Sequence, residues 1–564
     1  MIKKWIVFLI SSTLLLGLFI FFTVNEGAKE PVVSLGAASG FYPEGLFLEM
    51  QGANGEIYYT LDGSRPDEGD KHYEGGIQIG DASENENVYS LRDDVSVSFM
   101  DDLIHEREAG SPEDYVVPDE KVDKCTVVRA VCIDPMGGRS GEAVGVYFVG
   151  FDKKSGYDGV YMVSLSTDEE NLFDYDKGIY VTGKVTEEYL SSGERALNDD
   201  HWWWWPANYR MKGKDWEREA HVEIFDPSGT LVIKKDIGIR VQGGGSRAYL
   251  PRSMNLIAGE EYDGRGDFGL DLFGTGFAPD VITLFSGGDS RITKLEDYLP
   301  ARLCSGMGFD TMSFIPAVMF LNGEYWGFYF LTEKYDAGYF AGHYNIPERD
   351  LVMIKEGEVS IGRSSDKDLY ESDMSFLRNA DVQSEGGLKA VGERIDIDSY
   401  LDYYAVQLYI DRRNDWPYMN VAQWRCRNEG DKRWHWMLFD DNSGAYGSLS
   451  VSSNSIDNTR AVDPVFDNLM KSPVLYNGLR ERMLSLAENE FEPSKVREFV
   501  EQYRTLVTPV MKNEFDRFYG VKRDYEKSLQ VRLDRFESFF EGRSEYIRKE
   551  MFADKPYQAD QTGR

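Results

Sequence analysis

Three polar residues in the C-terminal half have the types and the spacing that phosphoryl transfer requires. Asp415 and Asn420 are five positions apart, and Asp440 follows after two further apolar segments. In protein kinases an Asp accepts the proton of the attacked hydroxyl, an Asn five positions later binds Mg²⁺, and a later Asp binds the metal that bridges the ATP phosphates. We therefore predict Asp415 as the catalytic base and Asn420 and Asp440 as Mg²⁺ ligands. The spacing alone leaves open the alternative that Asp415 and Asn420 are turn residues at a helix end.

The sequence around these residues predicts the elements that must position them. Apolar residues between 401 and 408 recur at the spacing of one helix face, and Pro417 ends any helix that precedes it. The alternation over 421–426, the turn at 428–431 and the apolar run 434–439 predict a β-hairpin. The order of helix, loop, hairpin and acidic loop would bring Asp415, Asn420 and Asp440 to one end of the hairpin.

A glycine-rich segment precedes this region and is predicted to contact phosphate. Gly243, Gly244, Gly245 and Ser246 lie between two predicted strands, 237–242 and 252–258. Glycines allow backbone N–H groups to approach phosphate closely, although such a segment can also be a simple hairpin turn. Kinases place a cation on an early strand to neutralise the phosphates, and Arg252 occupies that place here.

From about residue 150 to about residue 551 the chain resembles the spore coat protein H (CotH) kinase family. The resemblance rests on separated motifs in the right order, namely 238–247, 321–329, 331–334, 415–417 with Asn420, and 436–442. It implies a diverged two-lobed protein-kinase-like domain, the cofactors ATP and Mg²⁺, and transfer of phosphate to serine hydroxyls of an exported or coat-like protein.

The same resemblance assigns further residues and reveals two departures. Asp297, in a predicted helix over 292–303, matches a family acid and would orient the phosphate-binding cation, and Glu333 and Lys334 resemble the linker between lobes where adenine would sit. Arg252 replaces the family's lysine, and Asn442, a further metal candidate, replaces a second Asp. A pseudokinase that serves as a non-catalytic surface scaffold or binds polysaccharide is therefore the alternative.

The N-terminus predicts export. Lys3 and Lys4 precede an uncharged run over 5–24, long enough as a helix to span a bilayer core of about 30 Å. We expect an uncleaved signal-anchor within residues 1–30, which would make this a single-pass cell-membrane protein with its bulk outside. Cleavage would instead make it a secreted protein.

Composition limits the partners and the covalent chemistry. A formal charge of −35 argues against nucleic acid as a partner, because phosphate neutralisation needs clustered Lys and Arg. Cys125 and Cys132 flank a predicted strand, so the side chains are too far apart to bridge. We expect buried free thiols at these positions and at Cys304 and Cys426.

The predicted fold class is α+β, with an all-β (Ig-like) sandwich and an N-terminal membrane segment before the kinase-like domain. The sandwich covers 31–150, and its segment 57–64 with Pro66 resembles the small C-terminal domain of chitobiases. The kinase-like core is expected over 151–455, its helical C-terminal part over 456–556 and a tail over 557–564. Tryptophans 202–205 are either packed against a sheet or form a stacking platform for cell-wall polysaccharide or a peptide.

Overall fold

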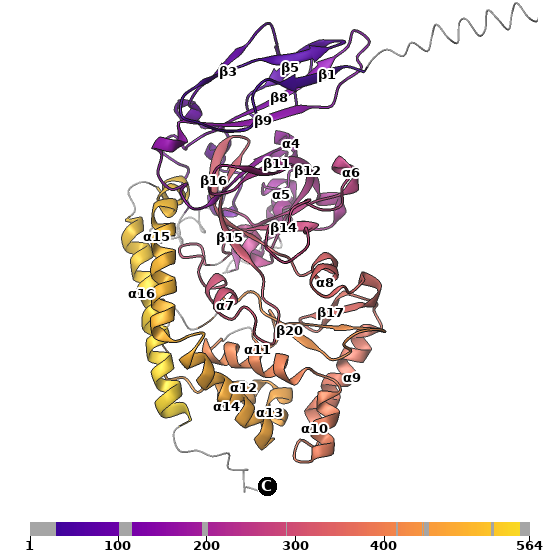
Figure 1. Cartoon of the computed structure of the whole chain (residues 1–564), viewed down its shortest axis with the longest axis vertical. Helices are drawn as coiled ribbons and strands as arrows, with labels where there is room; N and C mark the ends of the chain where they lie inside the picture. Colours follow the sequence, from indigo (N-terminus) through magenta and orange to yellow (C-terminus); the bar gives the residue numbers. More distant parts are fainter. Residues whose placement is uncertain are drawn as a thin grey trace, which may run out of the picture.

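The computed structural model describes residues 30–100, 115–193, 201–288, 290–412, 416–442, 444, 450–520 and 524–552. A β-sandwich, a β-barrel and a mainly helical lobe follow one another along the long axis (Figure 1). The predicted membrane segment, Asp415 and the C-terminal tail lie outside the described residues. Within those residues, no helix is both long enough and apolar enough to cross a bilayer.

The N-terminal sandwich consists of one main sheet and two additional strand pairs. Its main sheet has the order β2-β9-β8-β5-β6, and two strand pairs, β1-β4 and β3-β7, complete it. The strands are β1 (Val32–Leu35), β2 (Gly40–Tyr42), β3 (Leu46–Leu48), β4 (Met50–Ala53), β5 (Glu56–Thr60), β6 (Lys71–His72), β7 (Ile77–Ile79), β8 (Thr126–Ile133) and β9 (Ala143–Val149). All four cysteines are free and buried, as predicted.

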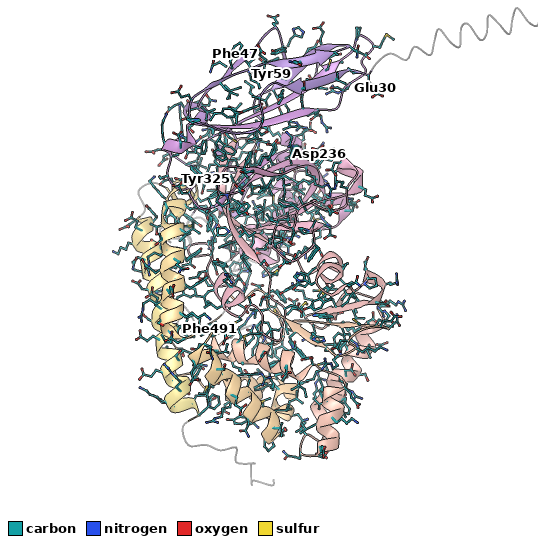
Figure 2. The ribbon with its side chains drawn as sticks, in the orientation of Figure 1. Glu30, Phe47, Tyr59, Asp236, Tyr325 and Phe491 are labelled. Carbon is teal, nitrogen blue, oxygen red and sulfur yellow. The ribbon has the colours of Figure 1, made fainter. Side chains whose placement is uncertain are left out.

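One face of the sandwich sheet packs into the core of the barrel. The Phe148 ring on β9 lies 5.6 Å from that of Phe225 and 5.2 Å from that of Phe320, both in barrel strands. The Tyr325 N–H donates to the Asp123 carbonyl at 2.8 Å. Figure 2 shows Tyr325 in the barrel beneath the sandwich and Phe47 on the sandwich above it. The sandwich therefore shares a core with the kinase-like region.

The barrel is closed in the order β10-β11-β12-β13-β14-β16-β15, with β10 and β15 parallel. Its strands are β10 (Tyr161–Ser166), β11 (Arg218–Phe225), β12 (Leu231–Val241), β13 (Met254–Ile257), β14 (Val281–Phe285), β15 (Phe314–Leu321) and β16 (Glu324–Thr332). The glycine-rich segment joins β12 to β13, as predicted. The predicted helix over 292–303 is confined to α7 (Tyr298–Leu303).

The lower lobe is built around a sheet of order β18-β17-β19-β20. These strands are β17 (Leu351–Lys355), β18 (Glu358–Ile361), β19 (Ala422–Cys426) and β20 (His435–Met437). The antiparallel pairing of β19 with β20 confirms the predicted hairpin, and α11 (Ile397–Tyr409) confirms the predicted helix before it. The longer helices around the sheet are α8 (Ala337–Tyr344), α9 (Asp366–Asn379), α10 (Glu385–Gly392), α12 (Ser455–Val462), α13 (Pro464–Leu469) and α14 (Pro473–Glu488).

Two long C-terminal helices, α15 (Pro493–Phe518) and α16 (Tyr525–Tyr546), run along one side of both the barrel and the lower lobe (Figure 1). Glu514 on α15 forms a fully buried ion pair with Lys294, with 2.5 Å between nitrogen and oxygen. The Lys294 ammonium also donates to the Phe328 carbonyl on β16 at 2.6 Å. Burial lowers the pKa of Lys294 and raises that of Glu514, and each partner opposes the other's shift. This pair ties α15 to the barrel.

Removing one member of this pair leaves an uncompensated buried charge. We expect Lys294→Met to lower the free energy of unfolding by about 3–5 kcal/mol, measured by urea denaturation, and the double variant Lys294→Met/Glu514→Met to lose less than the two single variants combined. Lys512 and Asp516 form an exposed pair on the same helix, so Lys512→Met is the control and should cost about 1 kcal/mol or less. Equal losses of unfolding free energy for Lys294→Met and Lys512→Met would show that the buried ion pair does not stabilise the protein more than an exposed one.

Candidate functional site

The register of the lower sheet brings two predicted metal ligands to one end of three strands. Ala422 pairs with Lys355 on β17 and with Met437 on β20, so Asn420 and Asp440 lie just beyond the same end. Both have positive φ, 54° and 57°, a conformation that Asn and Asp tolerate better than most residues. The Asn420 N–H donates to the carboxylate of Glu356, directly after β17, at 3.2 Å. The hairpin therefore brings these residues to the common end that the sequence predicts.

Three carboxylates gather beside this end of the sheet. Asp441 is 1% exposed, and its N–H donates to the Asp297 carboxylate at 2.6 Å. Burial raises the pKa of Asp297 well above its usual value, and repulsion from Asp440 and Asp441 raises it further. Burial also raises the pKa of Asp441 to about 6, although Arg412 and Gln407 oppose this shift. We name Asp297, Asp440 and Asp441 the acidic centre.

Two side chains from the end of α11 hold the acidic centre together. Arg412 and Gln407 both donate to one Asp441 oxygen, at 2.9 Å and 2.8 Å. Asp441 is thus fixed by protein donors, whereas Asp440 is the half-buried member of the group. The carboxylate of Asp440, with the amides of Asn420 and Asn442, offers the oxygen atoms that Mg²⁺ prefers.

The glycine-rich loop approaches the acidic loop across Gly288. A Cβ atom on Gly288 would lie 3.6 Å from the Ser246 Cβ and 4.0 Å from the Asn442 side-chain nitrogen. Gly288 has a φ of +55°, so a side chain there would also be strained. Residues that are almost 200 positions apart are thereby brought to one place, as a site between two lobes requires.

Two arginines and a tryptophan hold the glycine-rich loop from its other side. Arg247 donates to the Gly243 carbonyl at 2.8 Å, and Arg210 donates to the Gly244 carbonyl at 3.3 Å. The Arg210 guanidinium lies 4.6 Å from the ring centroid of Trp204, which is 51% exposed. Trp202 and Trp205 are instead buried in a small cluster, so the tryptophan segment is part packing and part surface.

Arg252 lies away from the site, which contradicts its predicted contact with phosphate. The side chain is 0% exposed, and its guanidinium donates to the carbonyls of Arg247 and Tyr180 at 2.6 Å and 3.3 Å and to that of Val95. Its guanidinium carbon also lies 4.0 Å from the ring centroid of Tyr209. Each guanidinium nitrogen thus donates to a backbone carbonyl, and the side chain is fully buried, so Arg252 is a core residue. The predicted role of Asp297 in orienting Arg252 fails with it, because Asp297 contacts Asp441.

The predicted linker residues lie at the end of β16. The Glu333 carboxylate is buried and accepts from the Ser313 N–H at 2.9 Å, and His343 is 2.6 Å from its other oxygen. Lys334 lies 3.8 Å from Asp336. These contacts join the linker to α8, while contact of either residue with adenine stays a prediction. Asp415, the predicted base, lies outside the described residues, between Arg412 and Trp416.

Arg543 on α16 fixes both segments that lead into the site. It donates to the carbonyls of Leu408 and Tyr409, at the end of α11, at 2.8 Å and 2.9 Å. It also donates to the carbonyls of Val451 and Ser453 at 2.9 Å and 2.7 Å. One segment precedes the loop that contains Asp415 and Asn420, and the other follows the loop that contains Asp440. Figure 2 shows Phe491 beside α15 and α16, at the level of the lower lobe.

Several of these residues are absent from the sequence-based prediction. Asp441 lies within the motif over 436–442 without a role of its own, and Gln407, Arg412 and Arg543 belong to no motif. The pair Gly287 and Gly288 directly after a strand is the signal that was available, because adjacent glycines often mark a close backbone approach.

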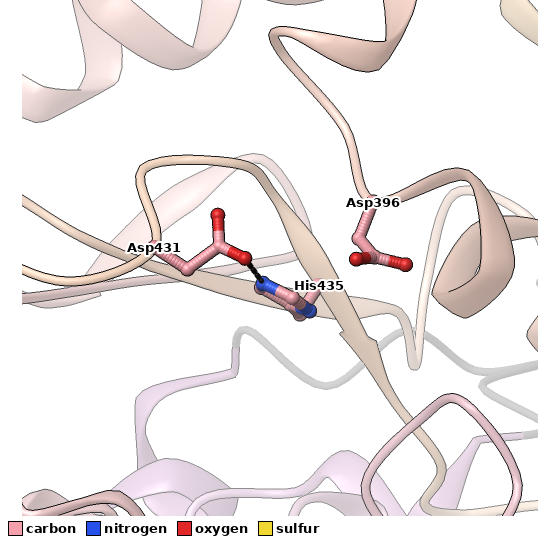
Figure 3. A group of neighbouring side chains, drawn as sticks. All are labelled: Asp396, Asp431 and His435. Carbon is pink, nitrogen blue, oxygen red and sulfur yellow. Dashed lines mark ion pairs between the residues drawn. The ribbon is translucent and has the colours of Figure 1, made fainter.

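A second group of metal-ligand residues lies apart from the acidic centre. Single ligand atoms of Asp396, Asp431 and His435 lie within 4.8 Å of one another (Figure 3). Arg433 donates to the Asp431 carboxylate at 2.9 Å and lies 2.8 Å from that of Asp396. The hydrogen bonds from Arg433 lower the pKa of Asp431 to about 2. Because a guanidinium already supplies the positive charge, we assign no metal to this group.

Comparison with protein families identifies two regions of the chain. Residues 239–547 match the model of the family described as CotH kinase protein, and residues 46–147 match the model described as Fn3 associated. The first match includes the glycine-rich loop, the acidic centre and both C-terminal helices. A search of curated proteins returns no match to this chain.

The Arg543 contacts predict a large loss of stability when its donors are removed. Arg543→Met would leave several buried carbonyls without a partner, at about 1–3 kcal/mol for each, so we expect the free energy of unfolding to fall by at least about 3 kcal/mol in urea denaturation. Arg535 is exposed on the same helix, and Arg535→Met should change it by about 0.5 kcal/mol or less. Similar values for the two variants would show that Arg543 does not fix these segments.

Proposed function

The chain belongs to the CotH kinase protein family, and from this premise we propose that it transfers phosphate from ATP, with Mg²⁺, to serine hydroxyls of an exported or coat-like protein. The observation that carries the proposal is the approach of the glycine-rich loop and the Asp440–Asn442 loop to Gly288. A kinase needs both parts on the same phosphates, since catalysis in these enzymes is mostly positioning and charge stabilisation.

The residues at the acidic centre fit a divalent cation. Carboxylate and amide oxygens are hard ligands, and burial, followed by repulsion from Asp440 and Asp441, raises the pKa of Asp297. Asp440, Asn420 and Asn442 would hold the metal, which would neutralise charge on the phosphates. Asp441 stays bound to Arg412 and Gln407 and thereby fixes the backbone next to Asp440.

The remaining roles follow from position along the chain. Asp415 lies between α11 and Asn420, where a base would accept the proton of the acceptor hydroxyl. Residues 5–24 would anchor the protein in the cell membrane and place the kinase-like domain outside. In this arrangement the acceptor is a protein on the same side of the membrane.

One observation favours the second candidate, a non-catalytic surface scaffold. Arg252, which matches the phosphate-binding cation of kinases, is enclosed in the core. A protein without that cation could keep the fold and use the exposed ring of Trp204 for polysaccharide. ATP binding in the presence of Mg²⁺ separates the candidates, because a scaffold has no need of it.

The base and the metal ligand can be tested separately. We expect Asp415→Asn and Asp440→Asn each to lower the rate of phosphoserine formation by at least about 10²-fold, because a general base and a metal ligand each act on the reacting groups. The measurement is label transfer from ATP to co-expressed exported proteins, with phosphoserine identified by mass spectrometry. Asp431→Asn is the control, because Asp431 belongs to the Arg433 ion-pair group, and it should keep the rate of the unmodified protein.

The same assay tests the effect of Asn442, which replaces a second Asp of the family. A second carboxylate beside Asp440 should strengthen metal binding, so Asn442→Asp should lower the Mg²⁺ concentration needed for half-maximal transfer. Full transfer by Asp415→Asn or Asp440→Asn would remove the corresponding residue from its role. Absence of ATP binding by the unmodified protein would favour the scaffold.

A further inference from the structure

Cations gather around the glycine-rich loop of a strongly acidic protein. The chain has a formal charge of −35, yet Arg210 and Arg247 bind this loop, and Lys212 interacts electrostatically with both and with Lys355. Across the described part of the chain, no carboxylate lies within ion-pair distance of these four side chains. The nearby Lys214, by contrast, pairs with Glu217 and Glu261. A group of positive charges without carboxylate partners favours the binding of an anion.

The barrel side of this group has a fixed geometry. Arg247 donates to the carbonyls of Gly243 and Met211, both at 2.8 Å. Because Lys212 follows Met211, its backbone lies next to the glycine-rich loop. Arg210 donates to the Trp203 carbonyl at 2.7 Å and is stacked on Trp204. Arg210 and Arg247 are thus committed to backbone carbonyls. Lys212 is exposed and makes no such contact among the described residues.

The lower lobe supplies the other side. Lys355 ends β17, and its ammonium lies 4.6 Å from the ring centroid of Phe439, the residue before Asp440. Glu356, the next residue, binds the Asn420 N–H. Lys355 therefore lies beside both predicted metal ligands, and its exposed ammonium is held by an aromatic ring instead of a carboxylate.

The cations of the two lobes repel one another. Loss of hydration lowers the pKa of Lys212, repulsion from Arg247, Arg210 and Lys355 lowers it further, and Glu356 opposes the shift. Burial, followed by repulsion from Arg210 and Arg240, lowers the pKa of Arg247 to about 10. An anion between Lys212 and Lys355 would relieve this repulsion and draw the two lobes together.

We propose that Lys212 of the barrel and Lys355 of the lower lobe form a site between the two lobes that binds the phosphate chain of a nucleoside triphosphate, in place of Arg252. This inference rests on the proposed function for the identity of the nucleotide. A phosphate chain fits better than a carboxylate-rich peptide, because the two lysines lie between a glycine-rich loop and candidate Mg²⁺ ligands, and each of these features suits phosphate.

Two probes separate this site from nucleotide binding as a whole. Tripolyphosphate without metal contacts only the cations, whereas ATP with Mg²⁺ requires the complete site, and calorimetry on the full chain measures both. We expect Lys212→Met and Lys355→Met each to weaken tripolyphosphate binding by about tenfold or more, as expected for the loss of one charge-assisted contact, and Lys→Arg at either position to retain most of it. Lys432, exposed at the opposite end of the same sheet, provides the control, and Lys432→Met should bind like the unmodified protein.

Each outcome of the calorimetry either supports or overturns the proposed lysine site. Unchanged affinity for tripolyphosphate in both Met variants, or no binding by the unmodified protein, overturns the site. Lysine-dependent binding of tripolyphosphate without any binding of ATP and Mg²⁺ supports the anion site and rejects the proposed kinase function. ATP binding that is insensitive to both lysines rejects the site and leaves the kinase proposal standing. All five lysine changes are at exposed positions, so the variants should melt like the unmodified protein.

Discussion

Holding three carboxylates together in a largely buried place is the constraint on which the rest of the lower lobe depends. Asp297, Asp440 and Asp441 come from different segments, and their mutual repulsion opposes folding. Arg412, Gln407 and the Asp441 N–H offset part of this repulsion. Because Arg412 and Gln407 belong to the end of α11, that end must lie at a fixed position. Arg543 fixes it by binding the last carbonyls of the helix.

The C-terminal helices therefore support the site through the segments that they bind. A helix with the 26 residues of α15 is about 39 Å long, enough to reach from the lower lobe to the barrel. Glu514 joins it to Lys294 in the barrel, while Arg543 on α16 contacts the segments on both sides of the candidate catalytic loops. The pair of helices thus sets the distance between the two lobes, and a cleft that binds phosphate from both sides needs that distance to be defined.

Local pattern predicted the elements of the site, and long-range contacts decided where the predictions failed. The hairpin over β19 and β20 follows from alternation and a turn, which depend on neighbouring residues. Arg252 fits the strand β13 and the position of a kinase cation, but Val95 and Tyr180, distant in sequence, enclose it. The predicted helix over 292–303 begins only at Tyr298, because Lys294 has a φ of +52° and reaches Glu514. The local sequence around Arg252 and Lys294 does not indicate that Val95, Tyr180 and Glu514 are their partners.

The acidic centre and the cations beside it show why the position of a residue in a family motif does not define the role of that residue. The Lys355 ammonium lies 4.6 Å from the ring centroid of Phe439, the residue before Asp440, and has no carboxylate within ion-pair distance among the described residues. A protein selected for stability alone would pair such neighbouring charges. Keeping acids on one side and bases on the other costs stability, and such a separation is typical of sites that take up a metal and an anion together.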